Sequence, residues 1–156
     1  MLVYRIAHKK YAQSLSVSGF EGRWNTFGKL VLYASENPAC ALLENMIYRV
    51  GNGFNDDYKT MVIYYPGENF EQVNVLDLPK NWRSEESYHH SQKLGDSWYD
   101  RHQSLCLRVP SSVLPDSQNV IFNTTHPEFN KVKLIDVLDF EPDERLERIL
   151  RKYKSK

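Results

Sequence analysis

The sequence predicts an α+β fold, in which mixed or antiparallel sheets and flanking helices make one compact domain. Short runs of β-forming residues outnumber the long helical segments, and the two kinds do not alternate as they would in a doubly wound parallel sheet. Neither G-x-G-x-x-G nor G-x-x-x-x-G-K-[ST] is present, although a conventional dinucleotide fold or a P-loop would show one of them. With 156 residues, of which 41% are hydrophobic, the chain can bury a sizeable core. We therefore expect a single domain that spans residues 1–156.

The first half of the chain contains a long connection and one clear helix between its strands. Residues 10–28 include three glycines and are expected to form a loop with a helical turn. Asn37 is a candidate N-cap, Pro38 stands at the first helical position, an apolar face follows, and Gly51 is expected to end the helix. Short apolar runs bounded by turn residues predict the strands. The expected strands cover residues 2–6, 30–34, 58–65, 72–76, 105–109, 120–122 and 132–137.

The second half is expected to contain three helical segments. The polar residues 84–94 predict an exposed helix or loop, and residues 96–103 predict a short helix around Trp98. A last helix is expected to begin at Pro142, and its basic tail suits the negative end of the helix dipole. The apolar face of this last helix is formed by Leu146, Ile149, Leu150 and Tyr153.

Charge and hydropathy exclude several classes of function. Lys and Arg together number 20, as do Asp and Glu, so the formal net charge is zero. This balance argues against nucleic-acid binding through a general basic field. Residues 1–6 are too short and too polar for a signal peptide, and no run has the length of a membrane span. We expect a cytoplasmic protein that binds neither membranes nor nucleic acid directly.

The cysteines and histidines give little support to thiol or metal chemistry. Cys40 and Cys106 lie far apart among apolar neighbours, so both are expected to be small buried side chains. His89 and His90, with His102 further on, raise the alternative of a zinc site. Adjacent histidines point in different directions, and no carboxylate at a suitable spacing completes a ligand set. We expect no metal.

A first group of candidate site residues lies in the segment 22–25 (GRWN) and the strand after it. Arg23, next to a glycine, can approach an anion and match two phosphate oxygens with its planar guanidinium. Asn25 offers a donor and an acceptor nearby, and Tyr33 ends an apolar strand where its ring could stack on a base or a nicotinamide. The alternative is a surface arginine in a turn and a half-buried tyrosine at a strand end.

A second candidate is Glu44, which stands on an otherwise apolar helix. A carboxylate on a mostly buried helix must be paired, neutralised or face a cleft. In a cleft it could bind ribose hydroxyls and stabilise the positive charge that develops as a glycosidic bond breaks. The alternative is that Glu44 faces solvent beside Asn45.

A third group follows the strand at 105–109. Ser111 comes after a strand and a proline, so its hydroxyl and backbone NH could face a pocket, but no G-x-S-x-G surrounds it. The alternative for Ser111 is a turn cap. Asn119, Asn123 and His126 are further polar candidates, and His126 could act as an acid or base or as a structural hydrogen-bonding group.

Taken in order along the chain, these segments resemble the RES-domain family, which is named after its Arg, Glu and Ser residues. The resemblance covers about residues 4–130, and the strand and helix at 132–154 complete the domain. The matching positions are Tyr4-Arg5, 22–25 (GRWN), 32–35 (LYAS), 41–44 (ALLE), Trp98, Ser104, 109–111 (VPS), Asn119, Asn123 and His126-Pro127.

The resemblance implies a fold similar to that of ADP-ribosyltransferases and a role as the toxin of a type II toxin–antitoxin pair. It implies an Xre-type helix-turn-helix antitoxin that covers the active site. It also implies cleavage of NAD at the nicotinamide–ribose bond, by hydrolysis or phosphorolysis, which depletes cellular NAD and arrests growth. NAD is then a consumed substrate, and no cofactor is required.

The resemblance also assigns roles to individual residues. Arg23, Tyr33, Glu44 and Ser111 match the family's catalytic set, with the adjacent Ser112 as the alternative serine. Two threonines precede His126 where the family pattern has a proline, so the position of this histidine is left open. The implied NAD-binding set is Arg5, Arg23, Asn25, Tyr33, Asn119, Asn123 and His126.

The residues also allow two other functions. ADP-ribosyl transfer to a protein would use the same NAD pocket and differ only in the acceptor. A non-catalytic module that docks an antitoxin or senses a ligand is the alternative outside enzymology, because abundant Tyr and Trp suit a protein interface as well as a pocket. Exposed aromatic residues would also suit a homo-oligomer.

Overall fold

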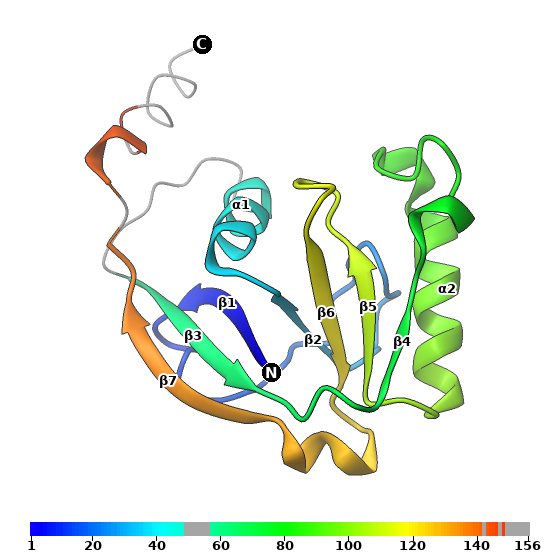
Figure 1. Ribbon diagram of the computed structural model, residues 1–156, viewed down its shortest axis with the longest axis horizontal. Helices are drawn as coiled ribbons and strands as arrows, with labels where there is room; N and C mark the ends of the chain where they lie inside the picture. Colours follow the sequence, from blue (N-terminus) through cyan, green and yellow to red (C-terminus); the bar gives the residue numbers. More distant parts are fainter. Residues whose placement is uncertain (49–56, 142, 147, 149–156) are drawn as a thin grey trace.

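The computed structural model describes residues 1–48, 57–141, 143–146 and 148. Within these residues, seven strands form one sheet in the order β4-β5-β6-β2-β1-β3-β7 (Figure 1). Neighbouring strands are antiparallel except for β4 and β5, which are parallel. The predicted α+β class is confirmed. The strands are β1 (Leu2–His8), β2 (Val31–Ser35), β3 (Tyr58–Tyr64), β4 (Phe70–Gln72), β5 (Cys106–Pro110), β6 (Gln118–Asn123) and β7 (Lys133–Asp139).

The sheet is divided between β1 and β2. β1 pairs with β3 along its whole length, from Leu2 to His8, but it pairs with β2 only where Tyr4 lies opposite Ser35. One half therefore consists of β7, β3 and β1, and the other of β2, β6, β5 and β4. The two halves diverge in Figure 1. At this split, side chains rather than strand pairing bind backbone carbonyl groups: Asn45 donates to Ile6 of β1, and Arg5 donates to Tyr33 of β2.

Alternate residues of the strands feed apolar clusters on opposite faces of the sheet, as the two-residue period of a strand requires. In β2, Leu32 joins one cluster and its neighbour Val31 joins the other. The second cluster packs the helix α2 (Tyr88–Arg101) against β5 and β6. The first cluster includes Val3, Leu32, Met61, Tyr65 and Phe122. The second includes Trp24, Trp82, Trp98, Leu107, Val109 and Ile121.

The helix α1 (Pro38–Tyr48) begins as the sequence predicts. The Oδ1 atom of Asn37 accepts a hydrogen bond of 2.8 Å from the backbone NH of Cys40, so Asn37 caps the helix. Further along α1, the Asn45 side chain donates to the carbonyl oxygen of Ile6 in β1 (3.0 Å). The predicted end of this helix at Gly51 lies outside the described residues. Through these contacts α1 is held against β1 and the end of β2.

The predicted strand at 72–76 is wrong in its position. Strand β4 ends at Gln72, and Val75–Asp77 forms a 3-10 helix instead. The Asn74 side chain accepts a hydrogen bond of 2.9 Å from the backbone NH of Leu76. This local bond starts a helical turn and competes with strand pairing.

The two separate segments predicted at 84–94 and 96–103 are also wrong. A 3-10 turn at Glu85–Ser87 leads directly into the single continuous helix α2. Gly95 lies inside this helix, where α2 approaches the Trp24 backbone. A Cβ atom at this position would lie 1.7 Å from the Trp24 carbonyl oxygen. The glycine therefore serves a close helix–loop contact rather than a helix end.

The remaining elements agree in part with the sequence-based expectations. Both cysteines are buried free thiols, as predicted. A 3-10 helix at Pro127–Lys131, which the sequence did not suggest, precedes β7. Burial raises the pKa of Cys106 to about 12. Of the predicted last helix, Leu146 is helical, whereas Pro142, Ile149, Leu150 and Tyr153 lie outside the described residues. Among the helices described, none combines the length and the hydropathy that a membrane crossing requires.

Candidate active site

A hydrogen-bonded cluster joins α1 to the ends of β5 and β6. Glu44 lies in α1, Ser111 directly follows β5, and Asn119 lies near the start of β6. The Oε1 atom of Glu44 accepts hydrogen bonds from Ser111 Oγ (2.7 Å) and from Asn119 Nδ2 (2.6 Å). Three residues predicted from the sequence therefore meet at one point, although 67 and 75 positions separate Ser111 and Asn119 from Glu44.

Ser111 is fully buried, and its hydroxyl group is completely used. Its Oγ atom accepts hydrogen bonds from the backbone NH groups of Val113 (3.2 Å) and Leu114 (2.9 Å). These two bonds orient the hydroxyl so that its proton is donated to Glu44. Of the two candidate serines, the structure places Ser111 against Glu44, and Ser112 contributes its backbone carbonyl to Arg83.

Asn119 is oriented by a residue to which the sequence assigned no role. The Oδ1 atom of Asn119 accepts a hydrogen bond of 2.6 Å from Ser35 Oγ, and Cys40 Sγ lies 3.7 Å from the same atom. Ser35 and Asn119 are opposite each other in the β2–β6 register. This bond fixes the amide so that its Nδ2 group points at Glu44. The sequence does not reveal that Ser35 lies opposite Asn119, because the pairing register depends on the tertiary structure. Its one local signal is that Ser35 follows Tyr33 by two residues, so that both side chains point to the same face of β2.

Glu44 has one anchored and one open oxygen. It is half-buried, and Oε1 accepts both hydrogen bonds, whereas no group in the described part of the chain donates to Oε2. A carboxylate held in this way keeps a fixed orientation and one free acceptor. Such a group can bind a hydroxyl group and stabilise a positive charge that develops beside it.

Arg5 lies at the split between the two halves of the sheet. Its Nη1 atom donates to the Tyr33 carbonyl oxygen of β2 (3.4 Å). Arg5 is half-buried, and desolvation lowers the pKa of its guanidinium from the usual value. This bond bridges the two halves just beyond their single shared position, Tyr4 and Ser35.

Tyr33 and Asn25 form a second polar group that holds the loop before β2. The Tyr33 hydroxyl donates to Asn25 Oδ1 (2.7 Å) and accepts from the Trp24 backbone NH (3.2 Å). Asn25 Nδ2 donates to the carbonyl oxygen of Phe20 (2.9 Å), and burial raises the pKa of Tyr33 above its usual value. A Cβ atom at Gly22 would lie 2.9 Å from the Tyr33 hydroxyl oxygen, which explains the glycine. The structure does not bring these side chains into contact with Glu44.

Arg23 contacts backbone carbonyl groups rather than the Glu44 cluster. Its Nη1 atom donates to the carbonyl oxygens of Trp82 (2.7 Å) and Ser84 (3.4 Å), and its Nη2 atom donates to that of Arg83 (2.8 Å). The guanidinium carbon also lies 4.3 Å from the ring centre of Tyr88. Arg23 therefore holds the 82–84 segment in place, and its predicted contact with a pyrophosphate stays a prediction.

Asn123 and His126 lie at the far end of β6. Asn123 follows Asn119 by four strand residues, which is roughly 13 Å. Asn123 Oδ1 accepts from the Thr125 hydroxyl (2.7 Å), and His126 Nδ1 accepts from the backbone NH of Glu128 (3.1 Å). These are local turn and cap bonds of the kind that short polar side chains form. The structure does not bring either residue to Glu44, and their NAD contacts stay predictions.

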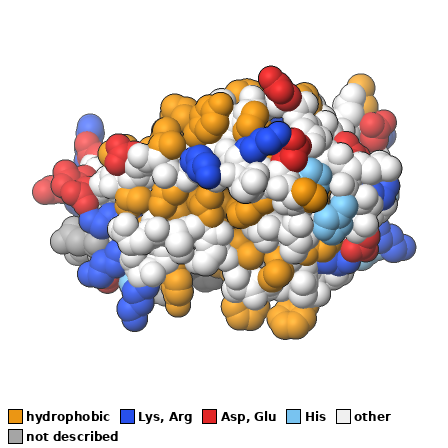
Figure 2. All heavy atoms as spheres, turned by 90° about the horizontal axis from the view of Figure 1, so that it is seen from below, with side chains coloured by type: hydrophobic (Ala, Val, Ile, Leu, Met, Phe, Trp, Pro, Cys, Tyr) orange, Lys and Arg blue, Asp and Glu red, His pale blue; other side chains and the backbone are white. Residues whose placement is uncertain are grey.

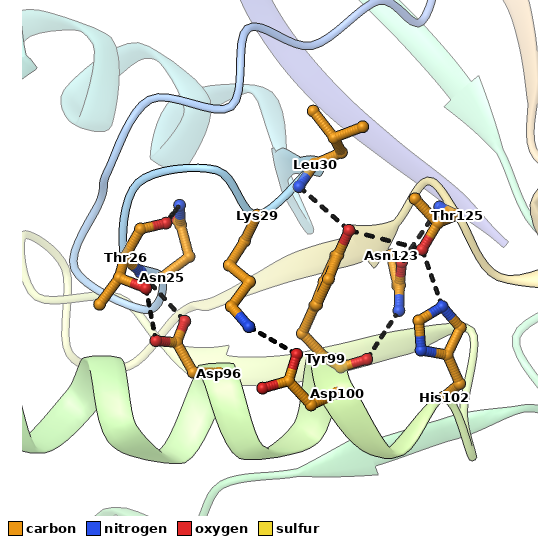
Figure 3. A network of polar contacts seen from close by, with 10 residues as sticks. All are labelled: Asn25, Thr26, Lys29, Leu30, Asp96, Tyr99, Asp100, His102, Asn123 and Thr125. Atoms are coloured by element: carbon orange, nitrogen blue, oxygen red, sulfur yellow. Dashed lines mark hydrogen bonds and ion pairs between the residues drawn. The ribbon is translucent and has the colours of Figure 1, made fainter.

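Asn123 belongs to a polar network that ties the loop before β2 to α2 (Figure 3). Tyr99 in α2 is its centre, because the Tyr99 hydroxyl accepts from the Leu30 backbone NH and its carbonyl accepts from Asn123. Nearer the start of the loop, Asp96 accepts from the Thr26 hydroxyl (2.6 Å). The network fixes the loop that carries Arg23 and Asn25.

Comparison with known proteins assigns the chain to a family. A family model described as the RES domain matches residues 2–147, which is nearly the whole chain. The chain belongs to the RES-domain family. The family predicted from the sequence motifs is therefore confirmed.

Relatives of this RES domain are similar over almost their full lengths. A protein named Toxin Res from Pseudomonas putida is 31% identical, and the match covers 94% of this chain and 99% of the relative. Another Toxin Res, from Photorhabdus laumondii, is 28% identical, with 94% and 97% covered. A protein named Prs ADP-ribosylating toxin from Sphingobium sp. is 29% identical, with 88% and 89% covered.

A solved structure shares the fold of this RES domain. It is the crystal structure of the MbcT–MbcA toxin–antitoxin complex of M. tuberculosis, one chain of which matches with a TM-score of 0.73. The sequences are 15% identical, and the match covers 97% of this chain and 88% of that chain. At this identity the likeness concerns the fold alone.

The Tyr33 hydroxyl is expected to stabilise the RES domain by about 2 kcal/mol. Tyr33→Phe leaves Asn25 Oδ1 buried without its donor, which costs about 1–3 kcal/mol. We expect thermal denaturation to show a midpoint lower by about 4–8 °C. Tyr11→Phe, at an exposed tyrosine, is the control and should change stability by less than about 0.5 kcal/mol. Unchanged stability together with lost activity would instead place the hydroxyl on the substrate.

Proposed function

We propose that this chain is the toxin of a toxin–antitoxin system and that it cleaves NAD at the nicotinamide–ribosyl bond. The observation that carries the proposal is the orientation of Glu44, with one oxygen anchored by Ser111 and Asn119 and the other open. Relatives of similar length named Toxin Res support the assignment as a toxin.

In the proposed reaction, the open oxygen of Glu44 accepts a hydrogen bond from a hydroxyl group of the nicotinamide ribose. The bond between the anomeric carbon and the nicotinamide nitrogen breaks, and its electron pair goes to that nitrogen, which becomes neutral. The Glu44 carboxylate stabilises the positive charge that develops on the ribose. Water or phosphate then adds to the anomeric carbon, and a proton is released to solvent. Ser111 and Asn119 keep the carboxylate in position.

The test is NAD turnover by the purified chain, measured by nicotinamide release with and without inorganic phosphate. Release without phosphate would show hydrolysis, and release that requires phosphate would show phosphorolysis. NAD that stays intact under every condition would overturn NAD cleavage.

ADP-ribosyl transfer to a protein is the second candidate function. It is favoured by the 29% identity to a relative named Prs ADP-ribosylating toxin. The same carboxylate would serve, because only the group that attacks the anomeric carbon differs. Intact-protein mass spectrometry of a lysate incubated with NAD and the chain separates the two. A discrete adduct on one protein favours transfer, whereas free ADP-ribose without adducts favours hydrolysis.

The proposal includes an Xre-type helix-turn-helix antitoxin that covers the active site and a cytoplasmic location. The toxin–antitoxin complex that shares the fold supports a protein partner. Phe20, Phe27 and Leu76 are largely exposed, at 66%, 73% and 89%. Figure 2 shows apolar side chains interspersed with charged ones over one face of the molecule.

Homo-oligomerisation stays a prediction. If overexpression of the folded chain proved harmless, a non-catalytic docking module would be favoured.

A further inference from the structure

Arg83 lies next to the Glu44 cluster, although the sequence motifs do not include it. Its Nε atom donates to the carbonyl oxygen of Ser112 (2.8 Å), and its own carbonyl oxygen accepts from Arg23 Nη2 (2.8 Å). Ser112 follows Ser111, which donates to Glu44. The Arg83 guanidinium is thus linked to the Glu44 carboxylate through two neighbouring residues: it donates to Ser112, and Ser111 donates to Glu44. The Cα atoms of Ser111 and Ser112 are about 3.8 Å apart.

The two arginines of this region differ in what their guanidinium groups contact. Both terminal nitrogens of Arg23 donate to backbone carbonyls of the 82–84 segment. Within the described residues, neither terminal nitrogen of Arg83 donates to a protein group, and no carboxylate pairs with it. Arg83 is exposed, and the hydrogen bond from its Nε atom to Ser112 fixes the direction in which its two terminal nitrogens point. Arg83 is thus a cation that is held in position and still has donors available.

We propose that Arg83 binds the substrate pyrophosphate beside Glu44, while Arg23 positions the segment that carries it. This inference rests on the proposed function. The ribose that loses nicotinamide carries its phosphate on the 5′ carbon, so a phosphate lies close to any ribose bound at Glu44. A guanidinium with two free terminal nitrogens matches two phosphate oxygens.

The test compares Arg83→Ala with Arg83→Lys, and Lys80→Ala is the matched control. Lys80 is exposed, lies three residues away and carries the same charge.

Two quantities are measured. The first is the affinity for ADP-ribose, determined by calorimetry. The second is the constant for inhibition of NAD cleavage by nicotinamide riboside, which has no phosphate. We expect Arg83→Ala to weaken ADP-ribose binding about 10- to 100-fold, the range for hydrogen bonds to charged groups. The inhibition constant of the riboside should stay within about twofold. Arg83→Lys should restore part of the affinity, since lysine keeps the charge but not the fork.

The outcomes separate this inference from the proposed function. If the wild-type chain cleaves NAD and Arg83→Ala binds ADP-ribose as tightly as Lys80→Ala does, the inference is overturned and the function stands. Equal weakening of both ligands in Arg83→Ala would show a general effect on the loop and would also overturn it. Binding of ADP-ribose that depends on Arg83, by a wild-type chain that leaves NAD intact, would support the inference and overturn the cleavage reaction. A wild-type chain that neither cleaves NAD nor binds ADP-ribose would overturn both.

Discussion

Glu44→Gln is expected to lower the rate of NAD cleavage about 1,000-fold, the upper end of the effect of removing one preorganised electrostatic group from an active site. Glutamine has the same shape, and its side-chain oxygen can still accept from Ser111 and Asn119. The variant loses the negative charge that stabilises the developing positive charge on the ribose. Nicotinamide release measures the rate, and thermal denaturation should show a folded protein of nearly unchanged stability.

Two further variants make the Glu44 experiment decisive. Glu21→Gln removes an exposed carboxylate and should leave both rate and stability unchanged. Glu44→Ala should also lose stability, by about 1–3 kcal/mol, because the buried donors of Ser111 and Asn119 lose their acceptor. Full activity of a folded Glu44→Gln protein would show that the charge takes no part in the reaction.

Gly95→Ala should lower the free energy of unfolding by at least about 3 kcal/mol, which corresponds to about 6–12 °C in the thermal midpoint. The new methyl group would lie 1.7 Å from the Trp24 carbonyl oxygen, so α2 and the loop must move apart. Helix propensity alone predicts the opposite sign, because alanine is more favourable than glycine in a helix by up to about 1 kcal/mol. A large loss of stability is therefore a specific sign of this contact.

Activity should fall together with stability in Gly95→Ala. Trp24 is adjacent to Arg23, which holds the 82–84 segment, and Arg83 in that segment contacts the loop next to Ser111. Lys93→Ala, at an exposed position of the same helix, is the control and should stay within about 0.5 kcal/mol. A Gly95→Ala protein more stable than the wild type would show that the loop yields without cost.

Features that depend on nearby residues could be predicted from the sequence. The start of α1 at Asn37 and Pro38 follows from cap chemistry within a few residues. Buried strands such as β2 and β6 follow from short apolar runs. The apolar run at 72–76 predicted a strand wrongly, because the Asn74 side chain accepts a hydrogen bond from the Leu76 backbone NH and starts a helical turn there.

The sequence by itself determined the α+β class, the family and the set of polar residues from which the site is drawn. Only the tertiary structure decided which of them meet. Glu44, Ser111 and Asn119 come together because β2, β5 and β6 pair in one register and α1 lies across their ends. The same pairing leaves Asn123 at the far end of β6 and adds Ser35, and the position of the 82–84 loop places Arg83 beside Ser112. Pairing register and loop position depend on contacts between residues far apart in the chain, which the chemistry of neighbouring residues does not specify.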